Sequence, residues 1–282
     1  MDALIVLVIL GLVLPIGVTA FRHDRAHALI FACQGQLSDV GKAMLSYAGD
    51  YDGALPAAGG RGTKWGPKLN NWSAATRSQA FGLDTNQTGG EATISASLYL
   101  LVRHNGVSPE SFVCGADKGV TEFRPQKYGV IDRGLADLWD FSANPARHCS
   151  YAYQMVYGPY LLATSGESST AIAADRNPWI DSPFAKAGDF SKFVPGLSPF
   201  EGTREQEHQG NAIMHGRRGQ NVLFLDGHVE YAMCPYCGYG DDNIYTSWKG
   251  KDKIRGTPPK LGSQPANRRD SLLVNDPSVP RR

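Results

Sequence analysis

The sequence predicts an α+β fold in which one long N-terminal helix packs against an antiparallel sheet. Two observations predict it. An uncharged apolar run from Ala3 to Phe21 continues, without a helix-ending signal, into an amphipathic stretch. Near the C-terminus, the segment from Gln220 to Met233 has the alternating pattern of a β-hairpin around Asp226-Gly227.

The first half of the predicted helix has the composition of a membrane segment. The run from Ala3 to Phe21 is about 19 residues long, close to the roughly 20 that cross a bilayer core. Arg22 and Arg25 follow it, and the positive-inside rule would place them in the cytoplasm. The residues expected to contact a membrane or a neighbouring helix are Leu4, Ile5, Val8, Leu12 and Pro15.

The second half of the predicted helix carries one apolar stripe. Its residues recur at alternating steps of four and three, which places them on one face. They are Ala26, Ile30, Cys33, Leu37, Val40, Met44 and Tyr47. Helix-ending signals come only at Gly49 to Gly53 and at Pro56. Residues 1–53 are therefore expected to be one helix, with a polar face and a face that needs a partner.

The partner of the stripe is expected to be an antiparallel sheet. Strand patterns lie at Cys149 to Tyr157 and at Thr170 to Asp175, and Ala92 to Asn105 has the spacing of a short amphipathic helix. In the hairpin, a two-residue Asp226-Gly227 turn sets the expected pairing. On the helix, the residues expected to be covered are Ile30, Cys33, Leu37, Val40 and Met44. The hairpin face expected to cover them consists of Val222, Phe224, Val229 and Tyr231.

The domain boundaries follow from composition. Residues 54–248 are expected to form one globular head on the helix. Residues 249–282 contain many Lys and Arg and few large apolar residues, which predicts a flexible basic tail. The formal net charge of the whole chain is only +1, so no nucleic-acid partner is predicted.

The five cysteines leave several pairings open. Cys33 lies on the apolar stripe and is expected to be a buried thiol. The other four, Cys114, Cys149, Cys234 and Cys237, could form disulfides outside the cytoplasm or a zinc site inside it. Cys234-Pro-Tyr-Cys237 has the letters of a glutaredoxin redox site, but it follows a hairpin strand and precedes a Gly-rich turn. A Cys234–Cys237 disulfide, or cross-links to Cys114 and Cys149, are favoured over redox catalysis, and a four-cysteine zinc knot remains an alternative.

Two groups of residues have metal-ligand chemistry. His215, Asp226 and His228 are zinc or iron ligand types, although hairpin geometry accounts for the last two. The oxygen ligands Asp241, Asp242 and Asn243 suit calcium, with a polar turn as the simpler explanation. No cofactor is predicted, and calcium and zinc are the alternatives. Hydrolase, metalloprotease and phosphate-binding motifs are missing from the sequence, so we do not expect an enzyme.

These patterns resemble a known family. The segments from Cys33 to Met44 and from Tyr47 to Pro56 are similar to the helix end of bacterial type IV pilin-like proteins, including type II secretion pseudopilins. The hairpin resembles the His-to-Asp-Gly motif of a prepilin processing-associated C-terminal domain. Its residues here are His215, Asp226, Gly227 and His228, with ten residues between His215 and Asp226 where the family usually has nine. Ala174 to Pro178 and Asp241 to Thr246 also resemble this family.

The resemblance implies a structural subunit that assembles into an extracellular or periplasmic filament through its N-terminal helix. It implies an inner-membrane anchor with a head outside the cytoplasm, and a pilin-like fold. The implied partners are copies of the chain, other pilin-like subunits, the inner membrane, and a prepilin peptidase if a leader lies upstream.

One departure from the family concerns the start of the chain. Prepilins have a short basic leader and a Glu at the fifth mature position, whereas this chain has Met1-Asp2-Ala3-Leu4-Ile5. We expect the leader to be encoded upstream. Without the Glu, a membrane-anchored binding protein that does not polymerise is the first alternative function. An anchored metalloprotein built on His215, Asp226, His228 and the cysteines is the second.

Overall fold

The computed structural model describes residues 2–160 and 162–278, with only the backbone described for residues 2–23. The helices are α1 (Asp2–Asp50), α2 (Arg77–Phe81), α3 (Ile94–Asn105) and α4 (Arg204–His208). The strands are β1 (Lys64–Trp65), β2 (Glu91–Ala92), β3 (Tyr151–Gln154), β4 (Ala171–Asp175), β5 (Gln220–Phe224), β6 (Val229–Ala232), β7 (Ser247–Lys249), β8 (Asp252–Thr257) and β9 (Leu273–Val274). Short 3₁₀ helices include η1 (Pro109–Phe112) and η6 (Ile213–His215).

The centre of the domain is a five-stranded antiparallel sheet in the order β6-β5-β4-β3-β9. Strands β3 and β4 lie where the sequence predicted them, and every residue in both is buried. Such strands are apolar on both faces because both faces of the sheet are covered. One face packs against α1 and α3, and the other contacts Trp179, Phe193 and Tyr245.

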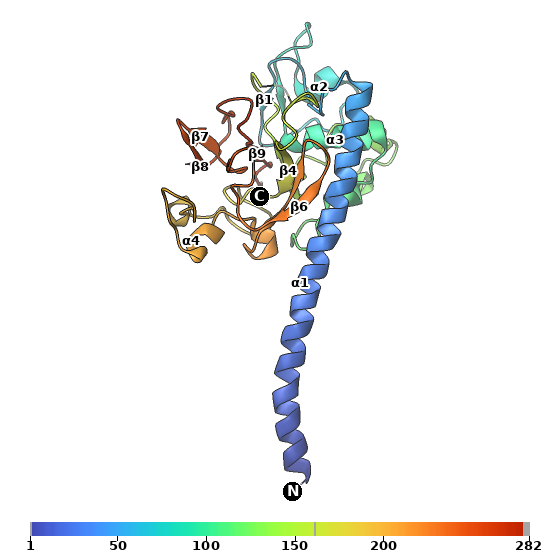
Figure 1. Ribbon diagram of the computed structural model, residues 1–282. Coiled ribbons are helices and arrows are strands. Elements are labelled where there is room, and N and C mark those ends of the chain that lie inside the picture. Colours follow the sequence, from blue (N-terminus) through green and yellow to red (C-terminus); the bar gives the residue numbers. More distant parts are fainter. Residues whose placement is uncertain (1, 161, 279–282) are drawn as a thin grey trace.

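Helix α1 forms the layer that covers the first face of the sheet. Its C-terminal half lies along the domain and its N-terminal half extends away from it (Figure 1). In the half along the domain, Cys33, Leu37, Val40 and Met44 are buried, whereas Ile30 is half-buried. Helix and strand approach closely at Gly41, where a Cβ would lie 2.6 Å from Leu223 Cδ1 and would force that side chain to shift.

Helix α3 begins at an N-cap threonine and ends at a glycine, which are common helix-capping residues. The Thr93 hydroxyl accepts a hydrogen bond from the Ala96 N–H at the N-terminus. Gly106 ends the helix at a φ of 67°, in the left-handed region that glycine adopts without strain. Residues Ile94 to Val102 are buried against α1 and the sheet, so the predicted short amphipathic helix is confirmed.

The pairing of strands β5 and β6 in the hairpin is shifted by one residue from the predicted register. The Phe224 N–H donates to the His228 carbonyl, which leaves Leu225, Asp226 and Gly227 as a three-residue turn. Leu223 therefore pairs with Val229, and Asn221 pairs with Tyr231. A shift of one residue moves one strand's side chains to the opposite face of the sheet.

That shift changes which hairpin residues cover α1. Leu223, with Val229 beside it, packs in the cluster that contains Leu37, Val40 and Met44. Val222 and Phe224, which were expected to face the helix, instead lie on the far face in the cluster with Trp179 and Phe193. Tyr231 stays on the helix side, where its ring meets that of His215 at a centroid distance of 6.2 Å.

The predicted transmembrane half of the fold and the inner-membrane location are corrected by the structure. Among the described residues, no helix is both long and apolar enough to span a bilayer. The described side chains of α1 have exposed charged residues, such as Arg25, Asp39 and Lys42, opposite a buried stripe, as in a helix lying on a protein domain. The fold is therefore α+β with an antiparallel five-stranded sheet. Residues Leu4, Ile5, Val8, Leu12 and Pro15 lie outside the residues whose side chains are described.

The predicted flexible tail is also corrected. Residues 249–278 contain β8 and β9, and β9 forms the edge of the central sheet beside β3. Leu272, Leu273 and Val274 are fully buried. Composition was misleading because this short apolar segment lies between polar stretches and finds its partner strand about 120 residues earlier in the chain.

Candidate functional site

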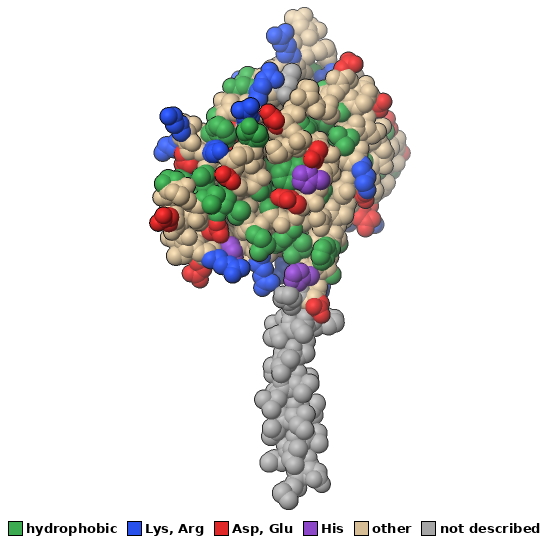
Figure 2. Space-filling model, viewed as in Figure 1, with side chains coloured by type: hydrophobic (Ala, Val, Ile, Leu, Met, Phe, Trp, Pro, Cys, Tyr) green, Lys and Arg blue, Asp and Glu red, His purple; other side chains and the backbone are tan. Residues whose placement is uncertain are grey.

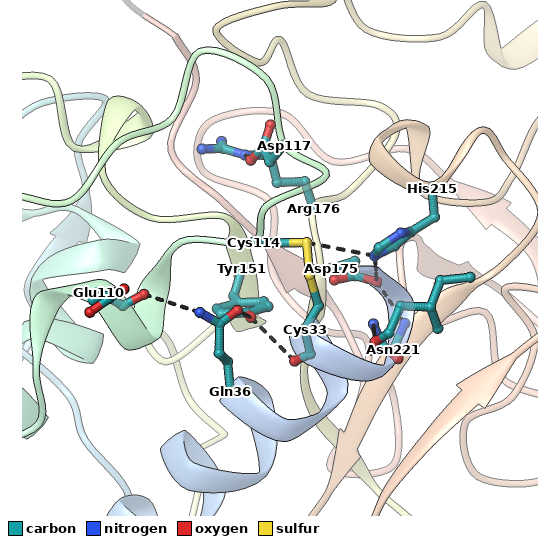
Figure 3. Close-up of a disulfide and its surroundings, with 11 residues drawn as sticks. Cys33, Gln36, Glu110, Cys114, Asp117, Tyr151, Asp175, Arg176, His215 and Asn221 are labelled. Atoms are coloured by element: carbon teal, nitrogen blue, oxygen red, sulfur yellow. Dashed lines mark hydrogen bonds and ion pairs between the residues drawn. A yellow bond between two sulfur atoms is a disulfide. The ribbon is translucent and has the colours of Figure 1, made fainter. Parts of the chain in front are cut away.

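The site with the most buried polar chemistry joins α1 to the rest of the domain (Figure 3). We name it the helix–head junction. It consists of Cys33, Cys114, Tyr151, Asp175, His215 and Asn221. All six residues are buried, and they come from α1, the segment after η1, β3, β4, η6 and β5.

A disulfide between Cys33 and Cys114 is the covalent part of the junction, with a Cα–Cα distance of 5.2 Å. Cys33 faces inward because it lies on the apolar stripe of α1. Cys114 follows η1, which Ser108 and Pro109 start and which packs against α1. The bond closes a loop with a sequence separation of 81 residues. In the chain-entropy model, a loop of this length corresponds to about 4 kcal/mol of stabilisation.

His215 and Asp175 form the ionisable part of the junction. His215 Nε2 lies 3.2 Å from Asp175 Oδ2 and 3.8 Å from Cys114 Sγ. Asp175 Oδ2 also accepts a hydrogen bond from the Asn221 N–H at 2.7 Å, and Asn221 Nδ2 donates to the Ile30 carbonyl of α1 at 3.4 Å. The pair therefore links η6, β4 and β5 to the face of α1 that carries Cys33.

Hydrogen bonds from Tyr151 and Arg176 complete the surroundings of the junction. The Tyr151 hydroxyl donates to the Cys33 carbonyl at 3.3 Å. Arg176 Nε donates to Asp117 Oδ2 at 2.6 Å, and the guanidinium also donates to the carbonyls of Ala146 and Cys149. Asp117 and Arg176 are almost completely buried, so each charge requires the other. This pair fixes the segment that carries Cys114.

The residues that could ligate a metal gather in the same place. Among the described residues, Cys33, Cys114 and His215 form a group whose potential ligand atoms all lie within 4.8 Å of one another. In the disulfide form the two sulfurs are bonded to each other and are not thiolate ligands. The arrangement as it stands is a cross-linked, hydrogen-bonded joint.

The residues of the predicted His-to-Asp-Gly motif do not form one site. His215 is in the junction beside Cys33, whereas Gly227 lies against Leu45. Cys33 and Leu45 are twelve residues apart on α1, or about 18 Å along its axis. Asp226 and His228 contact each other at the exposed end of the hairpin, where the hydrogen bonds from His228 lower the pKa of Asp226. A metal site shared by His215, Asp226 and His228 is therefore excluded by distance.

The cysteines pair differently from the prediction. Cys33 is in the disulfide with Cys114, while Cys149, Cys234 and Cys237 are free. Burial raises the pKa of the Cys234 thiol to about 11 and that of Cys149 to about 12. Neither has the lowered pKa that a nucleophilic thiol needs at neutral pH. The predicted four-cysteine zinc knot is not formed, because Cys114 is bonded to Cys33.

The predicted calcium ligands are used within the fold. Asp242 is buried and accepts hydrogen bonds from Trp248 Nε1 at 2.6 Å and from the Ser271 N–H at 2.7 Å. Asn243 accepts from the Tyr245 N–H and donates to the Ile254 carbonyl. Asp241 is exposed, with a φ of 67°. These contacts match the simpler interpretation of a polar turn.

A second buried polar cluster lies at the N-terminus of α3. Asp276 accepts hydrogen bonds from the N–H groups of Ile94 and Ser95 and from Trp65 Nε1. Asp140 accepts from the Thr93 and Ser95 hydroxyls. Burial, followed by the charge of Asp276, raises the pKa of Asp140 from its usual 3.8 to about 8. The two carboxyl groups are thus held by hydrogen bonds from the start of α3 and from Trp65.

Sequence reasoning missed the buried polar residues at the end of β4. Asp175, Arg176 and Asn177 were interpreted as a strand end and as part of a family resemblance, with no site role. In the structure, Asp175 contacts His215, and Asn177 donates to the carbonyls of Tyr245 and Leu273. The available signal was three consecutive polar residues directly after the apolar run Ala171 to Ala174, because a buried strand end requires partners for such groups. The pairing of Cys33 had no local signal.

One face of the molecule carries charges of both signs (Figure 2). On the face drawn in Figure 2, acidic and basic side chains are interspersed, in agreement with the formal net charge of +1. Models of known protein families, curated proteins and solved structures were compared with the chain, and none of them matches it.

Proposed function

We propose that the chain is a non-catalytic structural subunit of the pilin-like or pseudopilin-like kind, which assembles with copies of itself or similar subunits through α1. The observation that carries the proposal is the attachment of α1. Its C-terminal half is cross-linked and hydrogen-bonded to the domain, and its N-terminal half extends beyond it (Figure 1). A helix attached in this way transmits any packing between helices directly to the position of the domain.

The free face of α1 supports packing against another helix. Phe31 is 67% exposed, although it lies on the helix within a few residues of the junction. Ala28, Ala32 and Gly35 surround it on the same exposed face. Small residues beside a large apolar one allow two helices to approach closely with the ring between them. In this proposal, Phe31 and its small neighbours form the contact with the second helix.

The test compares two exposed apolar residues in the full chain. Phe31→Asp places a charge on the free face of α1, and Ile131→Asp places one at an equally exposed position (72%) outside the helix. We expect the wild type and Ile131→Asp to form filaments or concentration-dependent oligomers, and Phe31→Asp to remain monomeric. Negative-stain electron microscopy and sedimentation velocity measure both. Monomers at all concentrations for the wild type, or equal assembly of both variants, would contradict the proposal.

The second candidate function is a binding protein that does not polymerise. An open cleft of about 770 Å³ beside α3 favours it, with Arg103, Arg124 and Arg133 in its lining. All three arginines already donate hydrogen bonds to carbonyl or carboxylate oxygens of the domain, which weakens the case for an anionic ligand. Dispersed single particles of the wild type in the same microscopy would favour this candidate.

A further inference from the structure

The junction contains four side chains with the donor atoms of a zinc site. Cys33 Sγ, Cys114 Sγ and His215 Nε2 lie within 4.8 Å of one another, and Asp175 Oδ2 is 3.2 Å from that nitrogen. All four residues are buried, and they come from separate parts of the chain. Thiolate, imidazole and carboxylate are the ligands that Zn²⁺ takes in proteins, in sets of four at tetrahedral corners.

Two of the six distances between these atoms approach those of a zinc tetrahedron. Bond lengths of about 2.0–2.3 Å place neighbouring ligand atoms about 3.4–3.8 Å apart. The Cys114 Sγ to His215 Nε2 distance is 3.8 Å and the His215 Nε2 to Asp175 Oδ2 distance is 3.2 Å. Reduction of the disulfide frees the two sulfurs to separate to the spacing of two zinc ligands.

The surroundings of the four side chains favour a bound cation. Asp175 Oδ1 is buried and has no hydrogen-bond partner among the described residues, and the same is true of Asn221 Oδ1 and the Tyr231 hydroxyl. The buried carboxylate of Asp175 therefore has acceptor capacity that the protein does not use, and a metal ion held by this side chain would use it. Ala212 and Met214 pack around the sulfurs and exclude water, which strengthens metal–ligand interactions.

We propose that Cys33, Cys114, His215 and Asp175 bind one zinc ion when the Cys33–Cys114 disulfide is reduced. A dithiol reductant breaks the S–S bond, supplies two electrons and two protons, and becomes a disulfide itself. The two protein thiols then lose their protons to water as Zn²⁺ binds both sulfurs. In both redox states α1 stays joined to the domain, first by a covalent bond and then by a metal. This inference does not depend on assembly through α1.

The test uses the full chain with Cys149, Cys234 and Cys237 changed to Ser, so that the only thiols are Cys33 and Cys114. The protein is reduced with a phosphine under mildly unfolding conditions, returned to native buffer without metal, and given Zn²⁺. We expect one zinc per chain after desalting, by elemental analysis, and none in the oxidised protein. With Co²⁺ as the probe, the reduced protein should give the absorption of a tetrahedral site with thiolate ligands.

Two variants distinguish a zinc site with four protein ligands from zinc binding by the two thiols alone. His215→Gln removes one ligand and should weaken zinc binding by more than about 10–100-fold, the loss expected even for an outer-shell partner. Tyr231→Phe removes a neighbouring hydroxyl that is not a ligand and should bind like the parent. Circular dichroism of each reduced sample shows whether it is folded.

Every outcome of this experiment bears on the proposal. A reduced chain that folds only after Zn²⁺ is added supports it, because metal binding then contributes to folding. Three outcomes overturn it. They are a reduced, folded chain without stoichiometric zinc, a Co²⁺ spectrum without tetrahedral thiolate character, and a reduced chain that stays unfolded with Zn²⁺. If His215→Gln folds and binds zinc as tightly as the parent, the proposed ligand set is wrong.

Discussion

The two helices that pack against each other in this domain, α1 and α3, are attached by different chemistry. Helix α1 is attached along its side, by the Cys33–Cys114 disulfide and by hydrogen bonds to the carbonyls of Ile30 and Cys33. Helix α3 is attached at its end, where the Asp276 carboxylate accepts from the first N–H groups of the helix. A carboxylate at a helix N-terminus also interacts favourably with the helix dipole.

The difference has a physical consequence. Attachment along the side depends on a covalent bond, which pH does not change over the neutral range. Attachment at the end depends on two buried carboxyl groups, Asp140 and Asp276, whose pKa values burial raises. The strength of the α1 attachment should therefore depend on the redox state, and that of the α3 attachment on pH.

The largest expected effect is on α1. Replacing Cys33 and Cys114 together by Ser should lower the free energy of unfolding by about 4 kcal/mol, because the unfolded chain regains the entropy of the closed loop. Urea denaturation followed by circular dichroism measures it. The matched control replaces the free Cys234 and Cys237 by Ser and should change stability by less than about 1 kcal/mol. Similar losses in both double variants would mean that the disulfide does not stabilise α1.

The next effect concerns α3 and pH. Asp140 has a pKa of about 8 in the folded protein and 3.8 as its ordinary value, so the folded state binds more protons between these pH values. This contribution to stability is fully present below about pH 4, decreases as pH rises, and is constant above about pH 8. The slope should be at most about 1.4 kcal/mol per pH unit.

Asp140→Asn tests the pH dependence directly. The amide stays neutral at every pH and can still accept a hydrogen bond, so stability between about pH 4 and pH 8 should fall less steeply than in the wild type. Urea midpoints at several pH values give both slopes. Asp226→Asn is the control, since that carboxyl is exposed and its pKa is lowered. Equal slopes in Asp140→Asn and the wild type would show that Asp140 does not titrate in this range.

The same comparison explains what the sequence could predict. The buried stripe of α1, helix α3 and the strands β3 to β6 have local periodic patterns, and the structure places these elements where the patterns lie. The Cys33–Cys114 bond and the Asp276 contacts to α3 join residues 81 to 182 positions apart, and no local pattern reports such a contact. The hairpin register failed for a smaller reason, because Leu225 joins the turn and moves Val222 and Phe224 to the other face.

The smallest expected effect compares the two faces of α1 by adding one methyl group. At Gly41 a new Cβ would lie 2.6 Å from Leu223 Cδ1, whereas at Gly35 it would meet no atom within 4 Å. Alanine favours a helix by about 1 kcal/mol over glycine. Gly35→Ala should therefore raise the free energy of unfolding by about 0.5–1 kcal/mol. Gly41→Ala should lose that gain to overpacking of about 1–3 kcal/mol and leave stability lower than in Gly35→Ala. Urea denaturation of the two variants gives the difference. If Gly41→Ala were the more stable of the two, the side of α1 would not be closely packed on β5, and the disulfide would carry most of its attachment.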